Sequence, residues 1–123
     1  MITEHIDLIL LVTGCITSVV TLQFFFPDLY ANKILKIELV DDVSRFYFAH
    51  WGLVVLSISI MLVSASFIPE MQKPVAFATL IEKAPLAFLV FKNYKKPYAK
   101  MMLPAAIFDT VCSVLYVLFL LGL

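Results

Sequence analysis

The fold is decided by the stretch at residues 43–68, VSRFYFAHWGLVVLSISIMLVSASFI. Arg45 and His50 are its only basic residues, it contains no acid, and Pro69 follows it directly. About 20 consecutive apolar residues are enough for a helix to cross the hydrocarbon core of a bilayer. Because proline is poorly tolerated inside a helix, we expect one membrane-spanning helix here that ends before Pro69.

Three further apolar stretches, at about 6–26, 74–91 and 101–122, have the same character. The chain is 63% hydrophobic, with a mean hydropathy of +1.01, whereas soluble domains are roughly 45–50% apolar. A chain of 123 residues could not hide that much apolar surface from water. The sequence therefore predicts an all-α fold, a four-helix transmembrane bundle of antiparallel, up-down topology, as a single integral membrane domain over residues 1–123.

The three connectors differ in character. Residues 69–73 form a predicted tight turn, so the second and third helices should pack as an antiparallel hairpin, and residues 92–100 are short and basic. Residues 27–42 mix apolar side chains with Lys33, Lys36 and Glu38. That mixture allows two interpretations: an amphipathic helix lying in the membrane interface, or a plain connector whose apolar residues cap the bundle.

The distribution of basic residues predicts the orientation of this multi-pass protein. Four spans place the first and third connectors on one side of the membrane, and the opposite side holds Lys73 alone. Cytoplasmic loops carry an excess of Lys and Arg. We therefore expect both termini on the non-cytoplasmic side. The basic residues of the cytoplasmic side are then Lys33, Lys36, Arg45, Lys92, Lys95, Lys96 and Lys100.

Charge and cysteine content exclude several functions. The formal net charge is zero, so binding to nucleic acid has no electrostatic support. Cys15 and Cys112 lie in different apolar segments and form no CxxC pair, which argues against a zinc site and a thiol–disulfide relay. No metal site is expected, and the sequence does not specify a cofactor.

Ionisable residues inside the apolar stretches are the main indication of a site. A charge at the centre of a membrane helix costs about 2.5–3.5 kcal/mol and usually faces the bundle interior. At a rise of about 1.5 Å per residue, Glu82 and Asp109 lie about 12 Å from opposite boundaries and His50 about 10 Å from one. We expect these three to meet as catalytic, proton-transferring groups. Lys83 points about 100° away from Glu82, so it either snorkels or pairs with an acid on another helix; a kink is expected at Pro85.

Other polar residues recur at helical spacing with these groups. Ser113 and Tyr116 share a face with Asp109, Thr79 and Asn93 share one with Glu82, and Ser57 follows His50 by two turns. Trp51 adds an aromatic side chain near the boundary. The candidate ligand-binding residues are Tyr116, Ser113, Asn93, Trp51, Ser57 and Thr79. The alternative for the whole set is an interhelical hydrogen-bond cluster with a structural role.

Two junctions carry a resemblance to a known family. The first helix ends in Phe25-Phe26-Pro27-Asp28, the hairpin contains Phe67-Ile68-Pro69-Glu70, and the last helix carries Asp109. This layout resembles the DoxX-like group of small four-helix membrane proteins over nearly the whole length. The resemblance implies a four-helix bundle and, in some members, work alongside quinone-linked redox proteins.

Three functions follow as hypotheses. The leading one is an intramembrane polar pocket that binds an apolar or amphipathic small molecule, such as a lipid, sterol, isoprenoid or quinone. Two nearby buried carboxylates would leave one acid and one base, which would suit proton transfer or isomerisation, so enzymatic activity is an open question. The second hypothesis is a non-catalytic accessory subunit of a larger membrane complex, and the third is proton-coupled transport by a homodimer.

Overall fold

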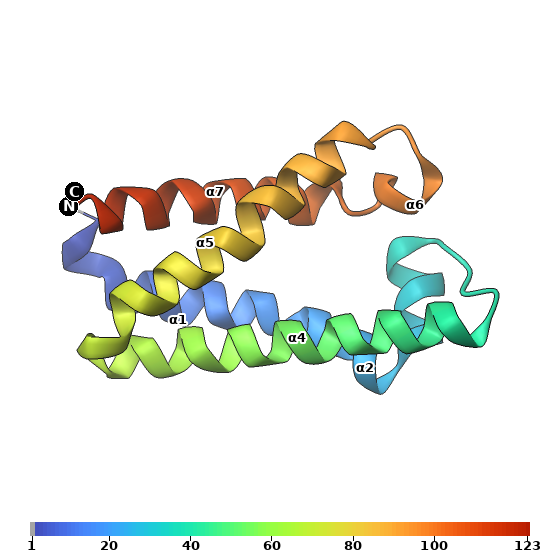
Figure 1. The fold of residues 1–123 in the computed structure, drawn as a ribbon, viewed down its shortest axis with the longest axis horizontal. Helices are drawn as coiled ribbons and strands as arrows, with labels where there is room; N and C mark the ends of the chain where they lie inside the picture. Colours follow the sequence, from blue (N-terminus) through green and yellow to red (C-terminus); the bar gives the residue numbers. More distant parts are fainter. Residues whose placement is uncertain (1) are drawn as a thin grey trace.

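The computed structural model describes residues 2–123 and is helical throughout its regular elements (Figure 1). Four helical stretches are long and apolar enough to cross a membrane: Thr3–Phe25, Asp42–Phe67, Pro69–Lys92 and Leu103–Leu120. The predicted all-α, four-helix bundle is confirmed. The elements are η1 (Thr3–His5), α1 (Ile6–Thr17), η2 (Ser18–Thr21), α2 (Leu22–Phe25), α3 (Pro27–Leu29), η3 (Tyr30–Leu35), α4 (Asp42–Phe67), α5 (Pro69–Lys92), α6 (Pro97–Lys100) and α7 (Leu103–Leu120).

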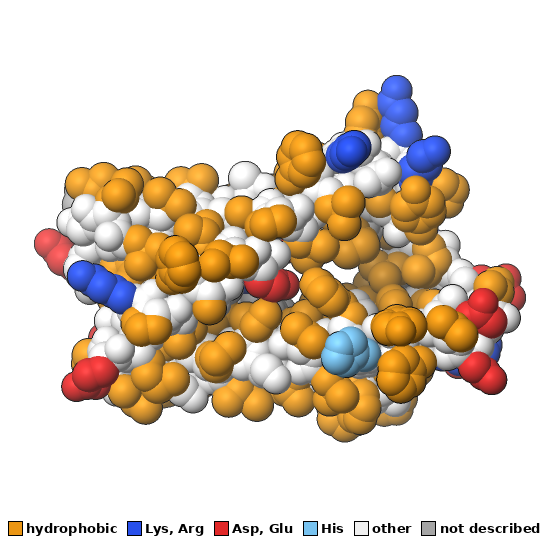
Figure 2. Space-filling view, in the orientation of Figure 1, with side chains coloured by type: hydrophobic (Ala, Val, Ile, Leu, Met, Phe, Trp, Pro, Cys, Tyr) orange, Lys and Arg blue, Asp and Glu red, His pale blue; other side chains and the backbone are white. Residues whose placement is uncertain are grey.

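The outer surface of the bundle is apolar, and charged side chains gather toward its two ends (Figure 2). Large side chains such as Phe67, Phe88 and Leu89 are more than half exposed. A water-soluble protein rarely exposes contiguous apolar patches of this extent. The surface therefore fits a bilayer environment, as expected of a multi-pass membrane protein.

One predicted connector is wrong, and one helix start shifts by two residues. The expected turn at residues 69–73 is helical, and Ile68 alone separates α4 from α5. Pro69 starts α5 because its missing N–H would be unpaired at the first helical position anyway. Pro74 and Pro85 both lie inside α5. The last long helix begins at Leu103 instead of residue 101, after the separate turn α6.

The connector at residues 27–42 packs on the bundle. Tyr30, Ala31, Leu35 and Leu39 are buried, and the ring of Tyr30 lies 6.0 Å from that of Phe48 in α4. The apolar residues of the connector therefore cap the bundle, as one interpretation expected, and residues 27–35 are helical, as the other expected.

The start of α4 is fixed by a side-chain cap. The Ser44 backbone N–H donates to Asp41 Oδ1 at 2.7 Å, the hydrogen bond that an aspartate directly before a helix typically accepts. That hydrogen bond lowers the pKa of the Asp41 carboxyl below its ordinary value. Arg45 pairs with Asp28 at 3.1 Å and with Asp42 at 3.6 Å on the exposed surface. The pair with Asp28 joins the connector to α4, whereas the pair with Asp42 lies within α4 itself.

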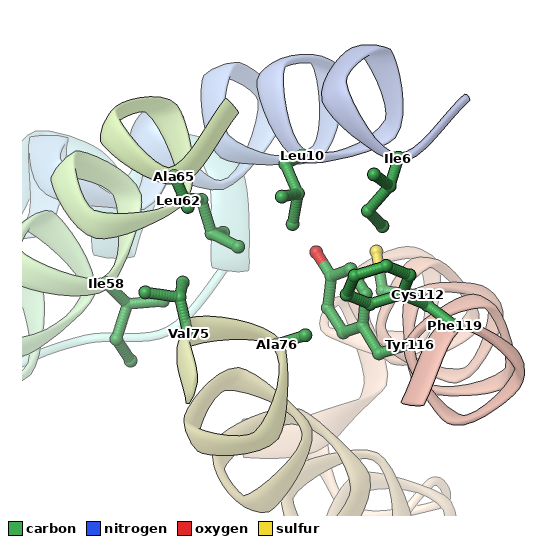
Figure 3. Packing of buried hydrophobic residues seen from close by; sticks show 10 residues of the cluster. All are labelled: Ile6, Leu10, Ile58, Leu62, Ala65, Val75, Ala76, Cys112, Tyr116 and Phe119. Carbon is green, nitrogen blue, oxygen red and sulfur yellow. The ribbon is translucent and has the colours of Figure 1, made fainter. Parts of the chain in front are cut away.

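The bundle consists of two tightly packed helix pairs, α1 with α4 and α5 with α7. The two pairs meet at the closed end of the bundle, which holds both termini, where the Ile2 N–H donates to the Leu123 carbonyl at 3.1 Å (Figure 1). The core of this closed end is shown in Figure 3 and consists of Ile6, Leu10, Ile58, Leu62, Ala65, Val75, Ala76, Cys112, Tyr116 and Phe119. At the opposite, open end, α5 runs obliquely away from α4 (Figure 1).

Two glycines permit the close approach of α1 and α2 to α4. A Cβ added at Gly14 would lie 3.0 Å from Leu62 Cβ, and one added at Gly52 would lie 2.6 Å from the Phe24 backbone nitrogen. Lipid provides little hydrophobic drive for helix association, so membrane helices depend on such close packing of small residues.

Candidate functional site

A cavity of about 480 Å³ lies between the two helix pairs toward the open end. Figure 2 shows a hollow between the upper and lower halves of the molecule, with an acidic side chain at its edge. Most of the lining residues are apolar, and they come from every long helix and from both longer connectors. The apolar walls include Val20, Leu35, Leu86, Met102 and Phe108. Small-molecule sites typically occupy 300–1,000 Å³, so this volume is of the right order.

An ion pair lies at the inner end of the cavity. Lys83 Nζ is 2.9 Å from Asp109 Oδ1, and the side chains are 3% and 9% exposed. The same ammonium donates to Thr17 Oγ1 at 3.2 Å and lies 5.1 Å from the ring centroid of Phe108. The pair is therefore embedded in protein contacts from α1, α5 and α7, as a charge at this depth requires.

The helix stripes explain why these two residues meet. On α5 the buried residues include Ala76, Thr79, Lys83 and Ala87, at intervals of three and four residues. On α7 the buried residues are Ala106, Asp109, Cys112, Tyr116 and Phe119. Residues at these spacings lie on one helix face. Because α5 and α7 pack along those faces, the lysine of one helix reaches the aspartate of the other.

Glu82 is the third charged residue of the cavity, and within residues 2–123 one of its carboxylate oxygens has no hydrogen-bond partner. It lines the cavity and is partly exposed. Its Oε2 atom is buried and accepts no hydrogen bond from any residue in the described range 2–123. A buried polar atom without a partner is costly, and in a native protein each such atom calls for an explanation. We refer to Glu82, Lys83 and Asp109 as the cavity floor.

The structure brings together part of the predicted site. Glu82, Asp109 and Trp51 all line the cavity. Lys83 lies with them, and of the two alternatives expected for it, pairing with an acid on another helix is the one observed.

His50 is not brought to Glu82 and Asp109, so its expected placement is wrong. Its side chain is exposed on the outer face of the bundle, as is that of Ser57, which donates to the Leu53 carbonyl of its own helix. The buried face of α4 includes Gly52 and Ser59. His50 precedes Gly52 by two residues, and two residues correspond to about 200° around a helix, so the histidine faces outward.

The remaining candidate residues lie outside the cavity lining. Tyr116 is fully buried in the closed-end core, where its hydroxyl points toward α1 (Figure 3) and hydrogen bonds to Thr13 Oγ1 at 2.7 Å. Thr79 is also fully buried, and its hydroxyl has no partner within residues 2–123. Ser113 and Asn93 donate to backbone carbonyls one turn earlier in their own helices.

Sequence reasoning missed two residues of the cavity, Thr17 and Tyr30, whereas the position of Gln23 near the end of the first helix suggested that it could reach the mouth of the site. Gln23 is buried and donates to the Phe48 carbonyl at 3.2 Å. Burial raises the pKa of the Tyr30 hydroxyl, which keeps it protonated and able to donate a hydrogen bond. Thr17 follows Thr13 and Gly14 on the buried face of α1, and the helical spacing of these small and polar residues was the available signal for its inward placement.

The floor and walls together define the chemistry of the site. An apolar enclosure with a few convergent polar groups is typical of small-molecule sites. Within residues 2–123, no cluster of three or more His, Cys, Asp or Glu residues could hold a metal ion. The two cysteines are free, with Cys15 exposed and Cys112 buried.

The comparisons with known proteins place the chain in no family. No protein-family model matches the chain, and no curated protein or solved structure matches it either. The resemblance to DoxX-like proteins therefore stays a prediction from layout.

Proposed function

We propose that the protein binds an amphipathic small molecule in the cavity, with the apolar part between the helix pairs and the polar group at the cavity floor. The observation that carries this proposal is the cavity itself, which combines apolar walls with Glu82, Lys83 and Asp109 at its inner end. An interhelical cluster with a purely structural role would not need Glu82, because the Lys83–Asp109 ion pair forms without it.

The test compares bound lipids between two matched variants. Ala105 lines the cavity wall on α7, whereas Ala84 is exposed on α5 and is not part of the lining. Ala105→Phe should fill the cavity, and Ala84→Phe should leave it open. The wild type and both variants are extracted in mild detergent, and the co-purifying lipids and quinones are identified by mass spectrometry.

We expect one small-molecule class to be enriched in the wild type and in Ala84→Phe and to be lost from Ala105→Phe. Identical lipid contents in all three proteins would overturn the proposal. If a large membrane protein co-purifies instead, and Ala84→Phe releases it, the accessory-subunit hypothesis is the better one.

We also propose that the open end of the bundle faces the cytoplasm. The open end is formed by the two longer connectors, which carry most of the Lys and Arg residues, and such residues are enriched in cytoplasmic loops. A cysteine introduced at Lys95, in a background with Cys15 and Cys112 replaced by serine, should then resist a membrane-impermeant thiol reagent in intact cells. Labelling at that position would contradict this orientation.

A further inference from the structure

We infer that the polar group of the ligand is a protonated amine that pairs with Glu82. This inference rests on the proposed function, since it names the chemical class of the molecule in the cavity. The inference is based on the charges of the residues that line the cavity and on the hydrogen bonds at the cavity floor. Within residues 2–123 those hydrogen bonds do not include Oε2 of Glu82.

The charges at the floor do not balance. Among the described residues that line the cavity, two are acids and one is a base. Lys83 Nζ forms an ion pair with Asp109 Oδ1 at 2.9 Å, and it also contacts Thr17 and Phe108. Charges withdrawn from water are tolerated when each has a partner of opposite sign. Glu82 is therefore the group whose charge an incoming cation would balance.

The hydrogen bonds point to the same class of ligand. The Oε2 atom of Glu82 is buried and accepts no hydrogen bond within the described part of the chain. A carboxylate is an acceptor when ionised, so the missing partner is a donor. An ammonium group supplies both the donor and the positive charge, and charge-assisted hydrogen bonds are about twice as strong as neutral ones. A hydroxyl would supply the donor alone, and a carboxylate would supply neither.

The apolar walls of the cavity indicate the chemistry of the rest of the ligand. Leu86, Met102 and Phe108 belong to the lining and present no charge. An alkyl or ring system would lie against these side chains while the nitrogen reaches the floor. The expected ligand class is a cationic amphiphile, that is, an apolar body with one basic nitrogen at its end.

The protein carries a suitable reporter for this inference. Trp51 is the only tryptophan of the chain, and it is half-buried in the cavity lining. Its fluorescence therefore reports on the cavity without interference from other tryptophans. The probes are dodecylamine, dodecanol and dodecanoic acid, which share one alkyl chain and differ in the head group. Each is titrated into the protein in the same nonionic detergent at neutral pH.

The expected result is a saturable change in Trp51 emission, with dodecylamine binding at least about tenfold more tightly than dodecanol. Dodecanoic acid should bind most weakly. Glu82→Gln should abolish the preference for the amine while dodecanol still binds, which shows that the variant is folded and its cavity intact. Glu70→Gln, which removes an exposed acid at the far end of the same helix, should behave like the wild type.

Two failures are distinguishable. If dodecanol binds as tightly as dodecylamine, or if Glu82→Gln keeps the amine preference, the inference about the head group is wrong while the proposed pocket stands. If none of the three probes changes Trp51 emission saturably, the pocket proposal fails as well.

Discussion

Breaking the ion pair between Lys83 and Asp109 should have a much larger effect than removing it entirely. The perturbations are Lys83→Met, Asp109→Leu and the double variant, all of which replace a charged side chain with an apolar one of similar size. Each single variant leaves one buried charge without its partner, because the two side chains are 3% and 9% exposed. The double variant leaves no charge behind.

The structure sets the magnitudes. At a separation of 2.9 Å and an effective dielectric constant of about 20, the attraction is about 6 kcal/mol. The desolvation of the two ions, several kcal/mol each, offsets most of it. The pair as a whole should therefore contribute little net stability. Removing one partner leaves the desolvation cost of the other uncompensated, and each single variant should lose about 3–5 kcal/mol, with the double variant close to the wild type.

The assay is unfolding by sodium dodecyl sulfate in mixed micelles, followed by far-ultraviolet circular dichroism. A double-mutant cycle then gives the interaction energy, which should be about 6 kcal/mol or more, because both single losses of about 3–5 kcal/mol are absent from the double variant. The control pair is Arg45 with Asp28, which lies on the exposed surface and should contribute at most about 1 kcal/mol. If the single variants of the buried pair lose less than about 1 kcal/mol and their effects add, the reasoning is refuted, since the two charges would then be solvated.

Three further predictions follow from single contacts. Gly52→Ala should destabilise the bundle by about 1–3 kcal/mol in the same unfolding assay, because the new Cβ would meet the Phe24 backbone nitrogen at 2.6 Å. Tyr116→Phe removes the buried hydrogen bond to Thr13 and should cost about 0.6–1.7 kcal/mol, the range of interhelical bonds in membranes. Asp41→Ala removes the α4 cap and should lower the melting temperature at neutral pH. Because the pKa of the folded Asp41 is lowered, its stabilisation is present above the unfolded pKa of about 3.9 and is lost as pH falls through the folded pKa.

Each of these predictions has a contrary outcome. A Gly52→Ala variant as stable as the wild type would show that α2 does not approach α4 as closely as described. A Tyr116→Phe variant without any loss would mean that the hydroxyl finds no partner in Thr13. A constant difference between Asp41→Ala and wild type from pH 7 to pH 2 would exclude the carboxylate as the cap.

The sequence predicts the four membrane-spanning helices well, because the length of each apolar stretch directly determines whether a helix can cross the bilayer. It also predicts that Glu82 and Asp109 lie at similar depths, since depth depends on distance along each helix. Which way each helix faces is harder to predict. On α4 the packed face is set by Gly52 and Ser59, which allow close approach, and the more polar His50 is turned outward.

Lys83 is a second residue whose direction on its helix was difficult to predict. The prediction separated it from Glu82 because adjacent residues point about 100° apart. On α5, however, the small residues Ala76, Thr79 and Ala87 share the face of Lys83. Their spacing was visible in the sequence and indicated that the lysine is on the packed side. The sequence suggested an intramembrane pocket, but the shape and lining of the cavity were not predictable, because they depend on the oblique course of α5 past α4 (Figure 1).

The two ends of the bundle have different consequences for mutational tolerance. The larger core cluster belongs to the closed end, where a loss of volume at Leu62 or Tyr116 would weaken packing among all four long helices. A smaller cluster of Ala87, Val90 and Ala106 joins α5 to α7 toward the open end. The walls of the cavity come largely from connectors and helix ends that contribute little to that core. Met101 is exposed and belongs to neither cluster, so a substitution there should change the shape of the cavity with little loss of stability, whereas Leu35 is buried and Met102 packs against the smaller cluster. Sequence changes around the cavity should therefore alter the shape of that space more than the packing of the closed-end core.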